Sequence, residues 1–280
     1  MKIDVVGASS TYEVTKILDS LAKQNISSEF VDPRTVSYII SNNEIKCFIN
    51  NKEYEVPTAI IVRGGFTGTL RDSGRLFLNY LSLIGVLILD KPEVVFKDLD
   101  KVYQSMALCS KGLPHPKTLY KIGFNDTNSL INENIVIKPN IGSKGRGISK
   151  VQSLSKDLDD DCFSQEFRGK PGEDIRVIMI NGKVVGGMKR SNSNGEWRSN
   201  IALGSNGSLF EVNSFLANIC KKAQEATDMF FCGIDILEDG NEYIILEVNR
   251  APQFKEFEKV TGINISKMLV EEVLNETSNK

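Results

Sequence analysis

Histidine is almost absent from this 280-residue sequence, because His115 is the only one. Catalytic centres that use a Ser-His-Asp or Cys-His pair would depend on this residue. It stands between two prolines in the segment LPHP, a pattern typical of a rigid connector. Chemistry in this chain is therefore expected to use carboxylates, lysines, arginines and a bound metal or cofactor.

Cysteine is sparse, and no CxxC pair occurs. An odd, scattered set predicts reduced, mostly buried thiols rather than a disulfide framework or a zinc site. The first residues, MKIDVVGASS, lack the charged-then-apolar pattern of an export signal, so a cytoplasmic location is expected. The five cysteines are Cys47, Cys109, Cys162, Cys220 and Cys232.

Long hydrophobic runs and an excess of one charge are also lacking. The longest apolar stretch, Tyr80 to Leu89, is too short to span a bilayer and predicts a buried strand. A net charge of −2 gives no general basic surface for nucleic acid, although a local basic cleft stays compatible with it. With 41% hydrophobic and 25% charged residues, the composition predicts a globular protein of two or three lobes.

The first ninety residues alternate short apolar runs with helical stretches. Strands are predicted at Ile3–Val6, Ala59–Val62 and Val86–Leu89, with helices at Thr11–Lys23 and near Arg71–Leu83. Strand, helix and strand at this spacing favour a small α/β lobe with a parallel sheet.

The rest of the chain predicts strands, two hairpins and three helices. Strands surround the glycine-rich segment IKPNIGSKGRGI, and the hairpins turn at Asn181-Gly182 and near Asp239-Gly240. One helix is capped by Asp98 or Asp100. The three helices are expected up to Lys111, at Ser214–Thr227 and at Ile265–Asn275, before a frayed polar tail, NETSNK.

The segment GSKGRG carries Gly142, Gly145 and Gly147 between two apolar strands, close to Lys138 and Lys144. Glycines let backbone amides approach phosphate oxygens, and the lysines add positive charge. The segment is not a Walker loop, since no Ser or Thr follows GK and a strand follows it. Two interpretations stay open: a phosphate-binding loop or a flexible hairpin tip.

Three oxygen donors lie around the second hairpin. Glu247 and Asn249 share a strand face because they are two residues apart. Asp235 joins that face if the turn is the three-residue loop Asp239-Gly240-Asn241, whereas a two-residue loop puts it on the opposite face unless a bulge intervenes. Oxygen donors without His or Cys select Mg²⁺ or Mn²⁺. The alternative is a solvated face of ordinary acidic residues.

Arginines precede this hairpin at Arg176, Arg190 and Arg198. A guanidinium can neutralise a transferring phosphoryl group or a substrate carboxylate with two parallel hydrogen bonds. An exposed, salt-bridged hairpin is the alternative interpretation.

Taken in order, these segments resemble the RimK-like branch of the ATP-grasp superfamily, ligases that add glutamate or related amino acids. The segments that carry the resemblance are IVIKP, the glycine loop, QEF, EDIR, WRSN, GIDIL and EVN. It covers the chain from about Lys101 to the C-terminal helix. It implies an α/β and α+β ATP-grasp fold: a small N-terminal α/β domain over 1–95, a central lobe over 96–164 and a C-terminal lobe over 165–280.

The resemblance also implies roles for individual residues. Glu166 and Phe167 would bind adenine through the backbone, and Asp174 would hold the ribose. Asp235, Glu247 and Asn249 would hold Mg²⁺ or Mn²⁺. ATP phosphates and the reacting centre would be contacted by Lys101, Lys138, Gly142, Gly145, Arg176, Arg190, Arg198, Ser199 and Asn200.

The implied reaction joins a carboxylate to an amine at the expense of ATP, with glutamate or a similar amino acid as one substrate. The acceptor would be a small molecule or a protein C-terminus, with no nucleic acid or membrane partner, and a homo-oligomer is left open. Gly204-Ser205 departs from the paired glycine of the family, which leaves the acceptor specificity open. RAPQFKEF stands where the ribosomal-protein ligases carry a glycine-rich segment, which argues against a ribosomal protein as acceptor. The alternatives are a LysX-type ligase acting on an amino-group carrier protein, a non-catalytic ATP-binding regulatory module, and a small-molecule kinase.

Overall fold

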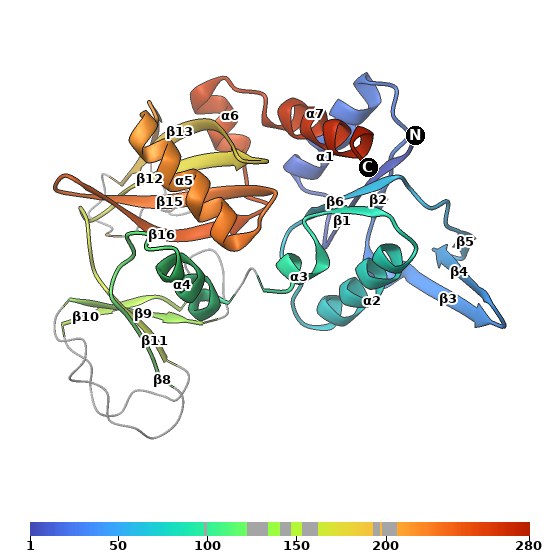
Figure 1. Ribbon diagram of the computed structural model, residues 1–280, viewed down its shortest axis with the longest axis horizontal. Helices are drawn as coiled ribbons and strands as arrows, with labels where there is room; N and C mark the ends of the chain where they lie inside the picture. Colours follow the sequence, from blue (N-terminus) through green and yellow to red (C-terminus); the bar gives the residue numbers. More distant parts are fainter. Residues whose placement is uncertain (98–99, 122–133, 141–146, 153–161, 193–196, 198–205) are drawn as a thin grey trace.

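Two large bodies lie side by side in the computed structural model (Figure 1). One contains a parallel sheet, and the other contains two antiparallel sheets. None of the helices among the described residues is long and apolar enough to cross a membrane. The structure describes residues 1–97, 100–121, 134–140, 147–152, 162–192, 197 and 206–280.

The N-terminal sheet is parallel, as predicted, with the strand order β2-β1-β6-β7. Its strands are parallel because helices α1 (Tyr12–Lys23) and α2 (Thr69–Leu83) carry the chain back between them. Thr11 begins α1 as the N-cap, where its hydroxyl accepts a hydrogen bond from the Val14 N–H. The strands are β1 (Ile3–Gly7), β2 (Phe30–Val31), β6 (Ala59–Arg63) and β7 (Leu87–Leu89). The segment Tyr80–Leu89 is therefore not one strand, since its first residues complete α2.

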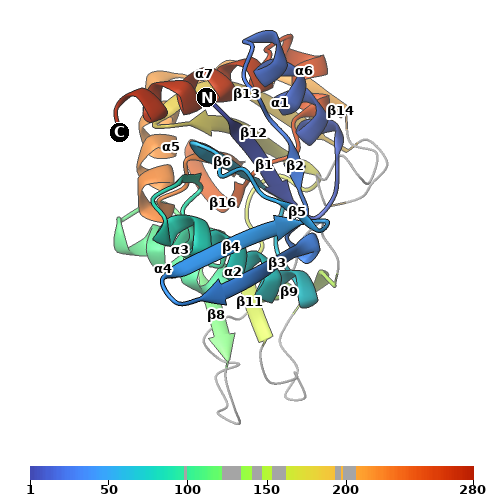
Figure 2. The ribbon, with the colours of Figure 1, turned by 90° about the vertical axis from the view of Figure 1, so that its right-hand side faces the viewer.

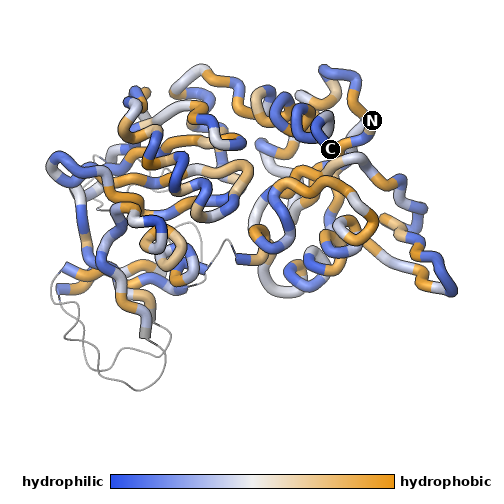
Figure 3. Tube along the Cα trace, in the orientation of Figure 1, coloured by the Kyte–Doolittle hydropathy of each residue, from blue (hydrophilic) through white to orange (hydrophobic). Residues whose placement is uncertain are grey.

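A separate ribbon of strands projects from this body and was not predicted from the sequence. It contains β3 (Val36–Ser41), β4 (Glu44–Ile49) and β5 (Lys52–Glu53) after a short 3₁₀ turn at Pro33–Thr35. Figure 2 shows the ribbon toward the viewer, and its hydrophilic tip stands out in Figure 3. It packs through Tyr38 against Tyr80 of α2, with ring centroids 5.3 Å apart.

The central sheet is antiparallel with the order β10-β9-β11-β8. It follows the short helix α3 (Pro92–Val95) and helix α4 (Lys101–Ser110), whose N-cap is Asp100, one of the two predicted caps. The strands are β8 (Thr118–Lys121), β9 (Ile135–Pro139), β10 (Ser149–Val151) and β11 (Cys162–Glu166). The three-part division of the chain stays a prediction.

The largest sheet has the order β14-β13-β12-β15-β16 and is antiparallel throughout. The predicted turn at Asn181-Gly182 joins β12 to β13, with both residues at positive φ. Helix α5 (Ser214–Thr227) covers one face, where its Leu216 and Cys220 join a buried core. The strands are β12 (Glu173–Ile180), β13 (Lys183–Ser191), β14 (Asn206–Phe210), β15 (Phe231–Asp239) and β16 (Glu242–Arg250).

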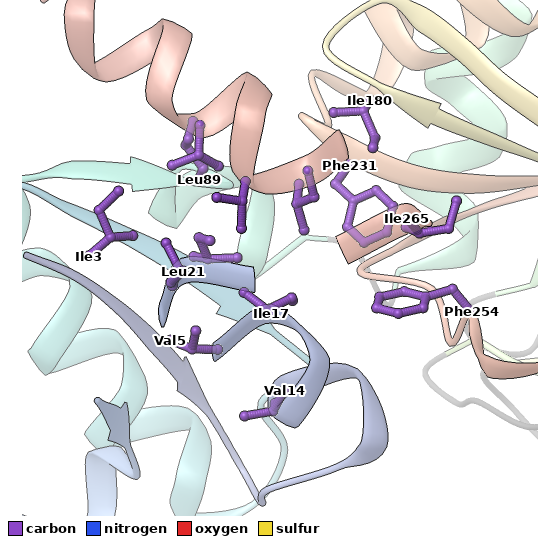
Figure 4. Packing of buried hydrophobic residues seen from close by; sticks show 14 of the residues in the cluster. Ile3, Val5, Val14, Ile17, Leu21, Leu89, Ile180, Phe231, Phe254 and Ile265 are labelled. Atoms are coloured by element: carbon purple, nitrogen blue, oxygen red, sulfur yellow. The ribbon is translucent and has the colours of Figure 1, made fainter. Parts of the chain in front are cut away.

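The two bodies share one hydrophobic core. Side chains from β1 and α1, such as Val5 and Ile17, lie in the same cluster as Ile180 and Phe231 of the largest sheet (Figure 4). Helices α6 (Lys255–Thr261) and α7 (Ile265–Ser278) complete this cluster, and α7 lies beside α1 in Figure 1. Because α7 continues to Ser278, the prediction that the segment from Asn275 is frayed is wrong for all but its end.

The described cysteines are free thiols, as predicted. Cys47, Cys220 and Cys232 are buried, and Cys109 is exposed.

Candidate functional site

A row of charged residues crosses one face of the largest sheet. Asp174 on β12 is paired with Arg190 on β13, and Arg176 on β12 is paired with Asp235 on β15. Asp235 in turn is paired with Glu247 on β16. Residues directly opposite each other in a ladder share a face, and so do residues two apart in a strand. The five side chains therefore lie on the face opposite helix α5.

Asp235 and Glu247 share this face because of a β-bulge. The turn between β15 and β16 is the two-residue loop Gly240-Asn241, since Asp239 is paired with Glu242. The expected three-residue loop is therefore wrong. The register shifts between Asp235 and Ile236, and Leu246 is the extra residue that brings Glu247 opposite Asp235. The alternative route to a shared face, a bulge, is confirmed.

Residues outside the sheet form hydrogen bonds with the outward-facing backbone groups of the bulged edge strand β16. The Ile245 N–H donates to the carbonyl of Pro114 over 2.8 Å. Three residues further on, the amide of Gln104 on α4 donates to the Val248 carbonyl and accepts from the Val248 N–H, both over 2.7 Å. Outward-facing groups on a regular edge strand recur every two residues, so the spacing of three follows from the bulge.

The charges of the row compensate one another. Arg176 binds both carboxylate oxygens of Asp235, and Arg190 does the same with Asp174 while lying 3.0 Å from Asp235. Burial would raise the pKa of Asp235, but the two guanidinium groups outweigh it and lower that pKa to about 2. Asp235 therefore remains a carboxylate at neutral pH. In this structure Arg190 binds both carboxylate oxygens of Asp174. A contact between Asp174 and the ribose stays a prediction.

Asn249 and Glu247 extend the row at the edge strand. The Asn249 amide lies 3.0 Å from Oε1 of Glu247 and 3.2 Å from Oδ2 of Asp235. Two carboxylates and one amide that can turn its oxygen inward are hard donors, and they suit Mg²⁺ or Mn²⁺ when phosphate and water complete the shell. Within the described parts of the chain, no group of three His, Cys, Asp or Glu side chains forms a metal cage. The donor set thus fits a cation shared with a bound phosphate.

Two lysines approach the row from the central sheet and α4. Lys138 on β9 is buried, and its ammonium donates to Oε1 of Gln165 over 2.8 Å. Burial lowers the pKa of Lys138 to about 8, although the charges of Glu247 and Asp235 act to raise it. Burial also lowers the pKa of Lys101, which Glu247 likewise counteracts. The ammonium groups of Lys101 and Lys138 therefore interact electrostatically with Glu247, and they supply positive charge opposite the carboxylates of the row.

The predicted adenine edge is already engaged in the sheet. The Glu166 N–H donates to the Lys117 carbonyl over 2.9 Å, and the Phe167 N–H donates to the Asn134 carbonyl over 2.7 Å. Adenine recognition by these two residues stays a prediction, and in this arrangement it would have to use their carbonyl groups.

Five predicted site residues lie outside the described residues: Gly142, Gly145, Arg198, Ser199 and Asn200. Gln104 was not predicted from the sequence, and Gln165 was predicted only as part of the QEF motif. Gln165 shares a strand face with Phe163, which is 2% exposed, and a glutamine on such a face needs hydrogen-bond partners. That alternation was the available signal.

Comparisons with known proteins identify the family of this chain. The RimK-like ATP-grasp domain matches residues 99–273. The alpha-aminoadipate–LysW ligase LysX of Saccharolobus solfataricus is 30% identical over 67% of this chain and 74% of its own length. A probable alpha-L-glutamate ligase of Halorhodospira halophila is 27% identical over 97% of this chain and 94% of its own.

Solved structures show the same fold. The ATP-grasp ligase PsnB, complexed with a minimal precursor, Mg and ADP, superposes with a TM-score of 0.77 over 98% of this chain and 97% of PsnB, at 17% identity. The predicted ATP-grasp architecture is thereby confirmed. The chain belongs to the RimK-like ATP-grasp family and is an ATP-grasp ligase that forms carbon–nitrogen bonds.

Proposed function

We propose that the protein joins glutamate or a similar amino acid to a carboxylate acceptor by way of an acyl phosphate. The observation that carries the proposal is the single sheet face on which Asp235 and Glu247 stand beside Arg176 and opposite the buried Lys138. Such a face gathers positive and oxygen-donor groups where a triphosphate and a carboxylate could meet.

The reaction proceeds in two steps. A carboxylate oxygen of the acceptor attacks the γ-phosphorus of ATP, forming an acyl phosphate and releasing ADP. The amino nitrogen then attacks the acyl carbon, inorganic phosphate leaves, and the nitrogen loses a proton to give the amide. No protein nucleophile is required, which is consistent with a chain that has one histidine.

The residues of the face have distinct parts in these steps. Lys138 and Lys101 neutralise phosphate charge, and Arg198 is proposed to face the transferring group together with Ser199 and Asn200. Arg176 binds Asp235 through Nε and one terminal nitrogen, so its remaining donors can reach a phosphate oxygen. Arg190 holds Asp174 and Asp235 in place. Mg²⁺ or Mn²⁺ held by Asp235, Glu247 and Asn249 would neutralise charge on the phosphate oxygens.

A substrate-dependence assay tests the proposal. ADP release is measured with ATP and Mg²⁺ over a panel of carboxylates and amino acids, and products are identified by mass spectrometry. We expect ADP release that requires both a carboxylate and an amine, together with a product heavier by the amino acid minus water.

Other outcomes identify the alternatives. ADP release with a phosphorylated product and no need for an amine would identify a kinase. Tight ATP binding without turnover, either over the panel or with a small carrier protein supplied as acceptor, would indicate a regulatory module. Either result would overturn the ligase proposal.

A carrier-protein acceptor is a second candidate. It is favoured by the 30% identity to a ligase that is named for acting on LysW. Under this proposal, turnover appears only when the acceptor carboxylate belongs to a small carrier protein, and free amino acids alone give no product.

A further inference from the structure

The single histidine, His115, is half-buried and lies in a network of polar groups that includes the buried residues Gln165 and Lys138. His115 Nδ1 lies 2.8 Å from the Ile245 carbonyl on β16, and Nε2 lies 3.2 Å from the amide nitrogen of Gln165 on β11. The oxygen of the same Gln165 amide accepts from Lys138 over 2.8 Å. These hydrogen bonds therefore connect the bulged edge of β16 to the buried Lys138 of β9.

The donor and the acceptor can be assigned for each hydrogen bond that links Ile245, His115, Gln165 and Lys138. A carbonyl can only accept, so the Ile245 oxygen requires a proton on Nδ1 of His115. An ammonium can only donate, so Lys138 requires the oxygen of the Gln165 amide and turns the amide nitrogen toward His115. Nε2 of His115 must then accept, which makes the ring the neutral Nδ1–H tautomer.

Neighbouring contacts agree with this assignment. The second N–H of Gln165 donates to the Thr118 hydroxyl over 3.0 Å, and that hydroxyl donates to the Pro116 carbonyl over 2.9 Å. The Ser105 hydroxyl lies 3.0 Å from Nε2 of His115 and 2.7 Å from the Lys101 carbonyl, and its one proton can be donated to either acceptor, so this contact is compatible with the assignment without fixing it. Burial lowers the pKa of His115, which Lys138 reinforces, so the ring is neutral at neutral pH.

The environment of Gln165 explains why its orientation matters. Its side chain is 1% exposed, so water cannot replace a lost partner. A turned amide would point its N–H groups at the Lys138 ammonium, and a donor facing a buried cation is unfavourable. Holding the amide in one orientation is therefore the same as holding the lysine in place.

We propose that His115 is a positioning residue: it holds the Gln165 amide so that its oxygen fixes the Lys138 ammonium beside Glu247. The role of Lys138 toward ATP rests on the proposed function, whereas the tautomer and the orientation of the amide do not. His115 itself touches no substrate in this proposal.

Two substitutions separate the two ring nitrogens. The side-chain nitrogen of asparagine reaches the place of Nδ1, so His115→Asn keeps a donor for Ile245 and removes the acceptor for Gln165. Glutamine reaches the place of Nε2, so His115→Gln keeps an acceptor for Gln165 and removes the bond to Ile245. Each variant thus keeps one half of the connection.

The test measures the dissociation constant of a non-hydrolysable ATP analogue with Mg²⁺ and the melting temperature of both variants. We expect the dissociation constant to rise about tenfold in His115→Asn and less than threefold in His115→Gln, because a lost bond of this kind is worth about one factor of ten. We expect the opposite order for the melting temperature, with His115→Gln the less stable. A dissociation constant that follows the melting temperature in both variants would overturn the proposal, since a purely structural histidine predicts that result.

A second measurement does not depend on nucleotide. With one histidine in the chain, selective ¹⁵N labelling of untagged protein gives a single imidazole, whose two nitrogen shifts report the tautomer directly. We expect the Nδ1–H form, and the Nε2–H form would overturn the proposal.

Lys138→Met distinguishes failure of this inference from failure of the proposed function. If Lys138→Met leaves analogue affinity unchanged, the proposed role of Lys138 toward ATP is wrong. If Lys138→Met weakens binding and His115→Asn does not, only the positioning role of His115 is wrong.

Discussion

Glu247 is the carboxylate that stands between the row of charges and the two lysines. Substituting Glu247→Gln keeps the shape but removes the charge, and a neutral amide binds a divalent cation far more weakly. We expect turnover to fall by about a hundredfold or more, as with the loss of one preorganised charge-stabilising group. The melting temperature should stay near that of the parent protein.

Glu242 on the same strand provides the matched control for this substitution. Its side chain is 72% exposed at the hairpin end, so Glu242→Gln should leave turnover unchanged. Steady-state rates at saturating ATP and Mg²⁺ are the measurement. Turnover of Glu247→Gln within a few-fold of the parent would remove Glu247 from the site.

If Lys138 contacts the ATP phosphates as proposed, nucleotide affinity should depend on pH. Only the protonated amine attracts phosphate, and its pKa in the free protein is about 8. Below pH 8 the lysine is charged and affinity is constant. Above pH 8 binding must first add a proton, so affinity should fall by about tenfold per pH unit until the pKa of the complex is reached.

Calorimetric titration of an ATP analogue between pH 6.5 and 9.5 measures this dependence. In Lys138→Arg, whose guanidinium stays charged across this range, we expect a flat profile. An equally flat profile in the parent protein would show that Lys138 does not contact the phosphates.

At the scale of the element, the β15–β16 hairpin depends on a close approach at Gly233. A Cβ at this position would lie 2.9 Å from Cδ of Arg176 and 3.0 Å from Cβ of Pro252. Gly233→Ala should therefore push Arg176 away from Asp235 while the ladder persists. We expect a fall in turnover of about tenfold or more, with far-ultraviolet circular dichroism unchanged. A parent-like rate would mean that the position of Arg176 is unimportant.

The hairpins also show how far the sequence predicts the structure. The Asn181-Gly182 turn was predicted because its positive φ values are a local requirement, and helix α5 because apolar residues recur at helical spacing. The bulge at Leu246 was left as one of two alternatives. Its position depends on which outward groups of β16 meet Gln104 and Pro114, and these residues are remote in sequence.

Dependence on contacts between residues that are remote in sequence also explains which features could not be predicted. The ribbon of β3, β4 and β5 contacts α2 through Tyr38, and its short strands carry a weak alternation of buried and exposed residues. Gln165 and His115 acquire their partners only when β11, β9 and β16 meet. Residue types predicted the chemistry of the face, whereas tertiary contacts determine the orientation of each group.

At the scale of the whole molecule, two arginines join the two bodies reciprocally. Arg63 at the end of β6 donates to the Pro252 carbonyl over 2.8 Å and lies over the rings of Phe231 and Phe254. Arg250 at the end of β16 donates to the Val62 and Gly64 carbonyls. Because Arg250 directly follows Asn249, this connection holds the N-terminal body close to the strand that carries the candidate metal ligands Glu247 and Asn249.

Removing the second of these arginines should uncouple the bodies. Arg250 is 7% exposed, and Arg250→Met leaves buried carbonyls and Asp90, 3.9 Å away, without this cation. We expect a loss of about 3 kcal/mol in the free energy of unfolding. Urea unfolding is followed by circular dichroism and by fluorescence of Trp197, the only tryptophan. The two curves should coincide in the parent protein and separate in the variant.

Arg168 offers the matched control for that experiment. It pairs with Asp239 at a hairpin end and is 33% exposed, so Arg168→Met should cost less than about 1 kcal/mol. Coincident curves in Arg250→Met, with a similarly small loss, would show that the shared core alone couples the two bodies.

The position of α7 has a consequence for how the protein is made. Ile265, Leu269 and Val273 pack in one cluster with Ile3 and Ile17, although α1 leaves the ribosome long before α7. Until α7 emerges, one face of the first parallel sheet is missing part of its cover, and a nascent chain exposes that apolar surface. We therefore expect the N-terminal body to depend on chaperones during synthesis and to become resistant to protease only when α7 docks.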